Sequence, residues 1–188
     1  MIKKWLEIIS DHRISLHERM FRLVTVICML ALVFTMPMGR TIWNILIMVV
    51  YLIAMMLIVK FSIKKKCIRT GATVITVLLL SLFPVCFFTA GGFYSGVPEW
   101  FVFCFVYVCI TLQGRRRGVF FVFCTLETLF CYTMAFYYPE LVAQNEQRHA
   151  FFDSALSVIM VGLLTCVLLM FLNRMYEEEN AIKKKQKK

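Results

Sequence analysis

Long apolar runs separated by short clusters of charged residues make up most of this chain. Each run is about 16 to 23 residues long, which suits an α-helix that crosses a hydrocarbon core of about 30 Å at about 1.5 Å per residue. The pattern predicts an all-α membrane protein, a bundle of six transmembrane helices. The expected spans are residues 21–38, 41–63, 71–88, 98–113, 119–138 and 154–173.

The segment before the first span, residues 1–20, is mixed in character. Ile2, Trp5, Leu6 and Ile9 recur at helical spacing with charged residues between them, which predicts a short helix lying in the cytoplasmic interface of the membrane. We therefore expect three parts: this interfacial segment, a six-helix transmembrane domain over residues 21–173, and a polar extension over residues 174–188.

The sixth apolar run passes directly into the polar extension. Neither Gly nor Pro follows Gly162, so no local signal ends the helix at the membrane surface. Glu179 and Lys183 form an i,i+4 pair in the favourable order, which helps an exposed helix to persist. We interpret residues 174–188 as the start of a cytoplasmic signalling helix; the alternative is a basic tail that only anchors the last span. The residues expected to transmit a signal are Arg174, Tyr176, Glu177, Glu178 and Glu179.

Composition agrees with the apolar pattern. Of 188 residues 61% are hydrophobic, and the mean hydropathy of +0.77 excludes a water-soluble domain. The net charge of +10 would suggest nucleic acid in a soluble protein, but here the basic residues flank apolar runs, so we expect a lipid bilayer and no nucleic acid. Of the 21 Lys and Arg residues, only Arg40 and Arg148 fall outside the expected cytoplasmic segments. The positive-inside rule therefore predicts that both termini are cytoplasmic.

The eight cysteines show no metal-binding pattern. Seven lie inside apolar runs, where Cys behaves as a small hydrophobic residue, and no CxxC motif occurs. We expect free thiols, no metal and no cofactor. Because HExxH and GxSxG motifs are also absent, no catalytic residues are predicted in this chain.

Glu127 is the only acidic residue deep within an expected span. A carboxylate at that depth costs a few kcal/mol unless it is neutral or paired, so the side chain should face the interior of the bundle. One interpretation is a group that responds to a proton or a ligand. The other is a protonated structural carboxyl that is hydrogen-bonded to Thr125, Thr128 or a neighbouring helix.

The loop between the third and fourth expected spans is rich in Gly and aromatic residues. Glycine permits backbone turns that other residues avoid, so this loop can re-enter the rim of the bundle and line a small external pocket with backbone amides. The alternative is a tight turn with a belt of interfacial aromatic side chains. The loop residues that we nominate for signal sensing, together with Glu127, are Gly91, Gly92, Tyr94, Glu99 and Trp100.

Three segments carry a resemblance to a known family. They are residues 15–23, which lead into the first span; residues 88–102, with the sequence FTAGGFYSGVPEWFV; and residues 174–180, which close the last span. Together they resemble the six-span N-terminal membrane sensor region of bacterial hybrid sensor histidine kinases, and related regions of some diguanylate cyclases. The resemblance implies a homodimeric receptor in the bacterial inner (plasma) membrane, whose last helix continues as a coiled coil into a cytoplasmic kinase or cyclase output domain.

This sequence departs from that family because it contains no phosphoacceptor His, ATP-binding motif or receiver Asp, so we expect any kinase activity to belong to a longer polypeptide or a partner. The expected function is signal input to a two-component phosphorelay, with an external or intramembrane signal passing through the last helix. The competing interpretation is a small six-span substrate-binding component of a membrane transporter, which would resemble vitamin-importer subunits in size and topology. The sequence identifies neither the signal, nor the output domain, nor the oligomeric state.

Overall fold

The computed structural model describes residues 16–38, 41–143 and 147–186, and these contain helices and turns but no strand. Most of the expected interfacial segment, residues 1–15, lies outside this range. Six α-helices are described: α2 (Leu16–Thr35), α3 (Ile42–Lys64), α4 (Ile68–Ala90), α5 (Val97–Thr111), α6 (Arg115–Tyr137) and α7 (Gln147–Gln186). Three short 3-10 helices lie in the connections: η1 (Met36–Met38), η2 (Gly92–Tyr94) and η3 (Pro139–Leu141).

Four helices are long and apolar enough to cross a membrane: α3, α4, α6 and, within α7, the segment Arg148–Glu177. The other two helices, α2 and α5, do not meet this criterion of length and apolar character. Helix α2 carries charged residues in its first turns, and α5 has only 15 residues. The chain is therefore an all-α, multi-pass membrane protein.

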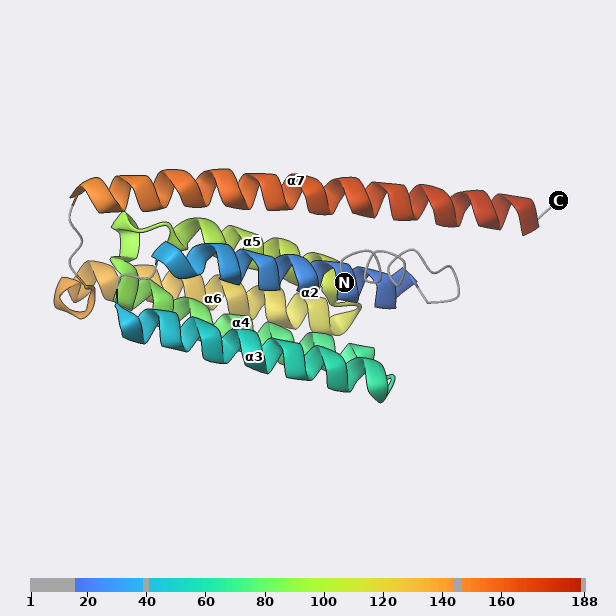
Figure 1. Cartoon of the computed structure of the whole chain (residues 1–188), viewed down its shortest axis with the longest axis horizontal. Coiled ribbons are helices and arrows are strands. Elements are labelled where there is room, and N and C mark those ends of the chain that lie inside the picture. Colours follow the sequence, from blue (N-terminus) through green and yellow to red (C-terminus); the bar gives the residue numbers. More distant parts are fainter. Residues whose placement is uncertain (1–15, 39–40, 144–146, 187–188) are drawn as a thin grey trace.

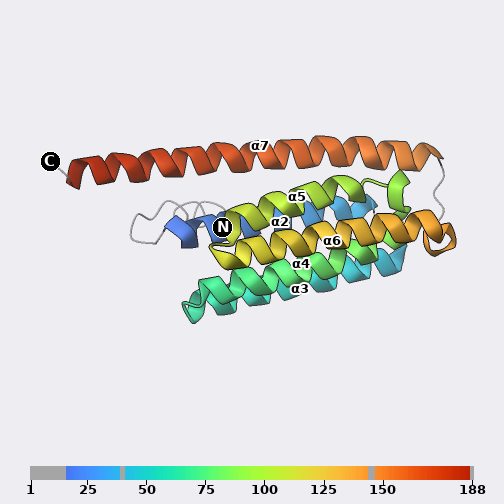
Figure 2. The same cartoon turned by 180° about the vertical axis from the view of Figure 1, so that it is seen from behind.

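Successive helices run antiparallel, and α7 lies along one side of the bundle, against α5 and α2, with α3 on the opposite side (Figure 1). The view from behind shows the same arrangement (Figure 2). The start of α2, the α3–α4 turn, the α5–α6 turn and the end of α7 lie at one end of the bundle. Most of the basic residues of the described part gather at this end: Arg19, Arg22, Lys64, Lys65, Lys66, Arg69, Arg115, Arg116, Arg117, Arg174 and Lys184.

Helix α7 runs without interruption for 40 residues, about 60 Å, and extends past the other helices (Figures 1 and 2). This continuity is what the lack of Gly or Pro after Gly162 predicts. Residues 147–153, which the hydropathy pattern places in an outer loop, are part of this helix. They are helical because Ala150 is buried against the bundle and Asp153 is hydrogen-bonded to the start of α5.

Local sequence signals set several helix ends. The Thr41 hydroxyl caps α3 by accepting a hydrogen bond from the Asn44 N–H at 3.2 Å. Gly91 ends α4 with φ of 113°, a left-handed conformation that glycine adopts without strain. Pro98 lies in the first turn of α5, where an N–H has no partner within the helix to lose.

The core lies where α2, α4 and α5 meet. It includes the fully buried side chains of Phe21, Val24, Ile75 and Tyr107. Helix α4 is the most enclosed of the long apolar helices, with 44% of its apolar window buried, against 17% for α3, α6 and α7. The outward faces of those three helices carry large exposed apolar side chains, as expected where lipid replaces water as the solvent.

The α3–α4 hairpin depends on close packing at Gly71. A Cβ atom at this position would lie 2.1 Å from Ser62 Oγ and 2.6 Å from Ser62 Cβ. We expect Gly71→Ala to force the two helices apart and to lower the free energy of unfolding by about 1–3 kcal/mol, measured by reversible denaturation in mixed micelles. Gly118→Ala is the matched control, because nothing lies within 4 Å of its Cβ. Equal stability of the two variants would contradict this packing.

Candidate functional site

Polar residues join the first turns of α5 and α7, far from the basic end of the bundle. The Gly96 N–H donates a hydrogen bond to Asp153 Oδ2 at 2.9 Å, and Trp100 Nε1 donates to Ser157 Oγ at 3.3 Å. The spacing of the participating residues places them on one face of each helix. We call six residues the α5–α7 junction: Gly96, Glu99, Trp100, Asp153, Ser154 and Ser157.

The backbone of α5 approaches α7 most closely at Gly96. A Cβ atom there would lie 1.9 Å from Ser157 Oγ and 2.7 Å from the Asp153 carbonyl oxygen. Gly96 has φ of −79°, which any residue can adopt, so the requirement for glycine is one of space. Small residues allow membrane helices to pack at such short distances.

Glu99 extends the junction by one further contact. Its Oε1 accepts a hydrogen bond from Ser154 Oγ at 3.2 Å. Its second oxygen, Oε2, is buried and has no hydrogen-bond partner among the described residues. Trp100, besides its bond to Ser157, packs edge-on against Phe103 with ring centroids 5.9 Å apart. Two of the nominated sensing residues are therefore in direct contact with α7.

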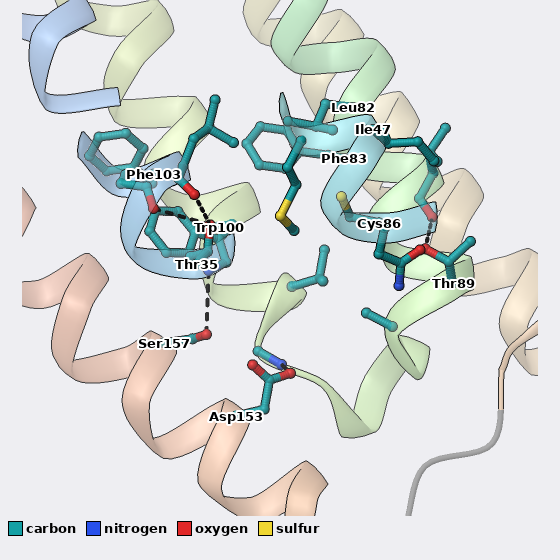
Figure 3. A pocket seen from close by; sticks show the side chains of 18 of the residues that line it. Thr35, Ile47, Leu82, Phe83, Cys86, Thr89, Trp100, Phe103, Asp153 and Ser157 are labelled. Carbon is teal, nitrogen blue, oxygen red and sulfur yellow. Dashed lines mark hydrogen bonds between the residues drawn. The ribbon is translucent and has the colours of Figure 1, made fainter. Parts of the chain in front are cut away.

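A cavity of about 650 Å³ opens beside the junction. Helices α2, α3, α4, α5 and α7 line it, and Figure 3 shows Asp153 and Ser157 on the α7 side with Leu82 and Phe83 across from them. Its volume lies within the usual range for small-molecule sites, and its lining is mainly apolar, as in such sites. The lining residues with polar side-chain groups are Thr35, Asn44, Thr89, Trp100, His149, Asp153 and Ser157.

The glycine-rich loop lies at the same end of the bundle. Most of its residues, Gly91 to Ser95, are not part of the cavity lining. Gly91 and Gly92 are buried, and η2 contacts α4, α5, α6 and α7. A Cβ at Gly92 would lie 2.8 Å from Val142 Cγ1, so the loop is packed tightly. Tyr94 points outward with 77% of its surface exposed. The structure thus brings Glu99 and Trp100 to α7, and leaves Gly91, Gly92 and Tyr94 as parts of a compact cap.

Glu127 is separate from this site. It lies on α6, which contributes nothing to the cavity, and its side chain is half-buried. Its Oε2 is buried without a hydrogen-bond partner among the described residues. The hydroxyls of Thr125 and Thr128, the neighbours considered as partners, donate instead to the carbonyl oxygens of Phe121 and Cys124.

The residues nominated for signal transmission follow one another along the last part of α7. Asn173 Nδ2 donates to Glu177 Oε1 at 3.4 Å, and the Tyr176 side chain is exposed. Arg174 lies in the same turn. Glu178 and Glu179 are on the same helix, but their side chains, and with them the expected Glu179–Lys183 pair, lie outside the described part of the structure.

Sequence reasoning missed Gly96, Asp153, Ser154 and Ser157. Asp153 and the two serines follow an i, i+1, i+4 pattern at the start of an otherwise apolar helix, and this was the available signal. Such a pattern indicates a polar face, because uncompensated polar groups are unfavourable in a membrane. It could not indicate which helix that face contacts.

No protein-family model, curated protein or solved structure matches this chain. Within the described residues, no group of three or more His, Cys, Asp or Glu side chains is arranged to hold a metal ion. All eight cysteines have free thiols. The junction and its cavity offer hydrogen-bonding groups, the carboxylate of Asp153 and apolar surface, which are the features by which small-molecule sites recognise their ligands.

A double-mutant cycle tests whether the Trp100–Ser157 hydrogen bond holds the two helices together. We expect Trp100→Phe and Ser157→Ala each to lower the unfolding free energy, with a coupling energy of about 0.5–2 kcal/mol between them. The measurement is reversible unfolding of the two single variants and the double variant. Strictly additive effects would show that the bond contributes nothing. Thr125→Ala serves as the control. The Thr125 hydroxyl donates to a carbonyl oxygen within α6, so we expect this substitution to show no coupling energy with Trp100→Phe.

Proposed function

We propose that this protein is the membrane signal-input module of a two-component system, passing an external or intramembrane signal to a cytoplasmic output domain. One observation carries the proposal. A single continuous helix, α7, lines the cavity with its first turns and extends beyond the rest of the bundle with its last ones. A change in the cavity and a displacement of the extension are therefore changes in the same rigid element.

The buried positions of α7 support transmission along its length. They are Ala150, Ser157, Val161, Leu168 and Met175, and they are spaced by seven or four residues. This spacing is typical of the contact seam between helices in a coiled coil. A helix that is packed along such a seam shifts or rotates as a unit. The reason is that packed interfaces switch between discrete arrangements and do not deform continuously.

The distribution of basic residues indicates how the module is oriented in the membrane. The clustering of basic residues at one end of the bundle favours a cytoplasmic location for that end. We propose six spans, with α2 and the short α5 crossing within the bundle, and both termini in the cytoplasm of a bacterial cell. The module would act as a homodimer in the inner (plasma) membrane, with a histidine kinase or diguanylate cyclase output domain following α7 in the same polypeptide.

The cavity also favours a second candidate, a small substrate-binding component of a membrane transporter. A volume of about 650 Å³ can hold a vitamin-sized molecule. The two functions differ in what binding does. A transport component would move its substrate across a vesicle membrane when combined with an energising partner, whereas a sensor would bind its signal without net transport.

An insertion series tests transmission through α7. The whole chain is fused to a kinase core, and one to seven residues are inserted after Asn180. Because each residue turns an α-helix by about 100°, we expect kinase output to oscillate with the number of inserted residues and to return near its starting level at seven, which is about two turns. Insertions between Arg116 and Arg117, in the first turn of α6, are the control. Output that is indifferent to the insertions in α7 would contradict the proposal.

Gly96→Ala tests whether the α5–α7 junction sets the position of α7. In the same fusion, the added methyl should push Ser157 away and change the basal kinase output several-fold, since coupling energies of about 1–3 kcal/mol are typical. Gly162→Ala, on α7 with nothing within 4 Å of its Cβ, should leave the output near wild type. If both variants behave alike, the junction does not control α7.

A further inference from the structure

We infer that the cavity beside the α5–α7 junction binds a lipophilic amine, an apolar molecule that carries a protonated ammonium group, with the ammonium at Asp153. The inference gives a chemical class to the signal of the proposed receptor, and in that sense it rests on the proposed function. The binding itself can be tested independently of any output.

Charge is the first argument. Among the described residues that line the cavity, Asp153 is the only acidic one, none is Lys or Arg, and His149 is the only titratable base. The Gly96 N–H holds the carboxylate through Oδ2 at 2.9 Å. Asp153 is half-buried, and a carboxylate held beside apolar helices is costly unless it is paired; a bound cation supplies the missing charge. A carboxylate or phosphate on the ligand would instead face repulsion from Asp153, and among the described lining residues only the imidazole of His149, one turn before Asp153 on α7, can offset it.

The second argument is the division of the cavity into a side that carries the carboxylate and an uncharged, mainly apolar side, to which Asn44 on α3 and Thr89 on α4 add neutral polar groups. Asp153 and Ser157 lie on the α7 side, whereas Leu82 and Phe83 on α4 and Ile47 on α3 lie across the space (Figure 3). An amphiphile fits this division, with its head group at α7 and its body between α3 and α4. Trp100 also lines the cavity, and its aromatic ring adds a surface that favours a cation.

The third argument is the position of the cavity. Its lining residues place it at the end of the bundle opposite the basic clusters, against helices α3 and α7 whose outward faces are apolar. Phe152 and Leu156 line the cavity and are also exposed on the surface of the bundle, so a ligand that partitions into lipid has a route to it. An ammonium bound at Asp153 would lie within one helical turn of Ser154 and Ser157, the α7 residues that hold α5.

The test uses the full chain in nanodiscs of zwitterionic phosphatidylcholine and three probes with the same alkyl chain: dodecylamine, dodecanol and dodecanoate. Binding of each radiolabelled probe is measured by scintillation proximity, with empty nanodiscs as background. We expect saturable binding of dodecylamine at one molecule per chain, and affinities at least about tenfold lower for dodecanol and dodecanoate, because only the amine pairs with the carboxylate.

Two variants and one control complete the design. Asp153→Asn retains an oxygen that can accept from the Gly96 N–H, and should lower dodecylamine affinity at least about tenfold. Leu156→Trp, at a half-exposed lining position on α7, should fill the cavity and abolish binding without a change in charge. Glu140→Gln removes an exposed carboxylate at the same end of the bundle, outside the cavity lining, and should leave affinity within about twofold of wild type.

Equal binding of amine and alcohol, or an Asp153→Asn variant with wild-type affinity, would overturn the inference, as would the absence of saturable dodecylamine binding. The fusion to a kinase core separates this outcome from failure of the proposed function. No binding together with output that still depends on insertions in α7 refutes the amine and leaves the receptor. Binding that depends on Asp153, with output indifferent to dodecylamine and to the insertions, supports the site and refutes the receptor.

Discussion

The close approach of α7 to Gly96 is the constraint on which the candidate site depends. Because residue 96 has no side chain, the α7 backbone at Asp153 and the Ser157 side chain can lie directly against the start of α5. That proximity brings the Gly96 N–H within 2.9 Å of Asp153 and Trp100 Nε1 within 3.3 Å of Ser157. Without it α7 would be an apolar helix packed on α2 and α5 by dispersion alone, because apolar contact gives no hydrophobic gain between helices in lipid.

The same constraint explains why a cavity exists next to so tight a contact. Helix α7 is anchored to α5 along the junction, whereas α3 is anchored to α4, with Gly71 and Ser62 in contact at the other end of the bundle. The space between these two anchored pairs is bounded by five helices and is filled by none of them. The carboxylate of the cavity, Asp153, is also a member of the α5–α7 junction. One side chain therefore sets the charge of the cavity and attaches α7 to α5. A ligand that binds this carboxylate acts directly on the contact that positions the helix.

How far the sequence predicts this structure differs from one feature to another. The apolar runs predict the helices, and the missing helix-stop signal predicts that α7 continues past the bundle, since both are local properties of the chain. The start of α7 at Gln147 was not predicted, because residues 147–153 are polar enough to resemble a loop and are helical through contacts with other helices. Glu99 and Trp100 were nominated from the composition of their loop, and they contact α7. Their partners on α7 could not be found, because pairing between helices that are more than fifty residues apart in the chain leaves no trace in local periodicity.

The energies involved decide whether a ligand could move α7 at all. Hydrogen bonds between membrane helices contribute about 0.6 kcal/mol on average and at most about 1.7 kcal/mol, so the three bonds of the junction hold α7 with about 2–5 kcal/mol. A ligand shifts a two-state equilibrium only by its differential affinity, and each tenfold preference is worth about 1.4 kcal/mol. A preference of about 30- to 3,000-fold for one position of α7 therefore matches the strength of the junction. A ligand whose ammonium replaces the Gly96 N–H as the partner of Asp153 would weaken one of the three bonds and form a charged pair in its place. Since α7 is continuous from this point to Gln186, the displacement would reach the far end of the helix without any further conformational step.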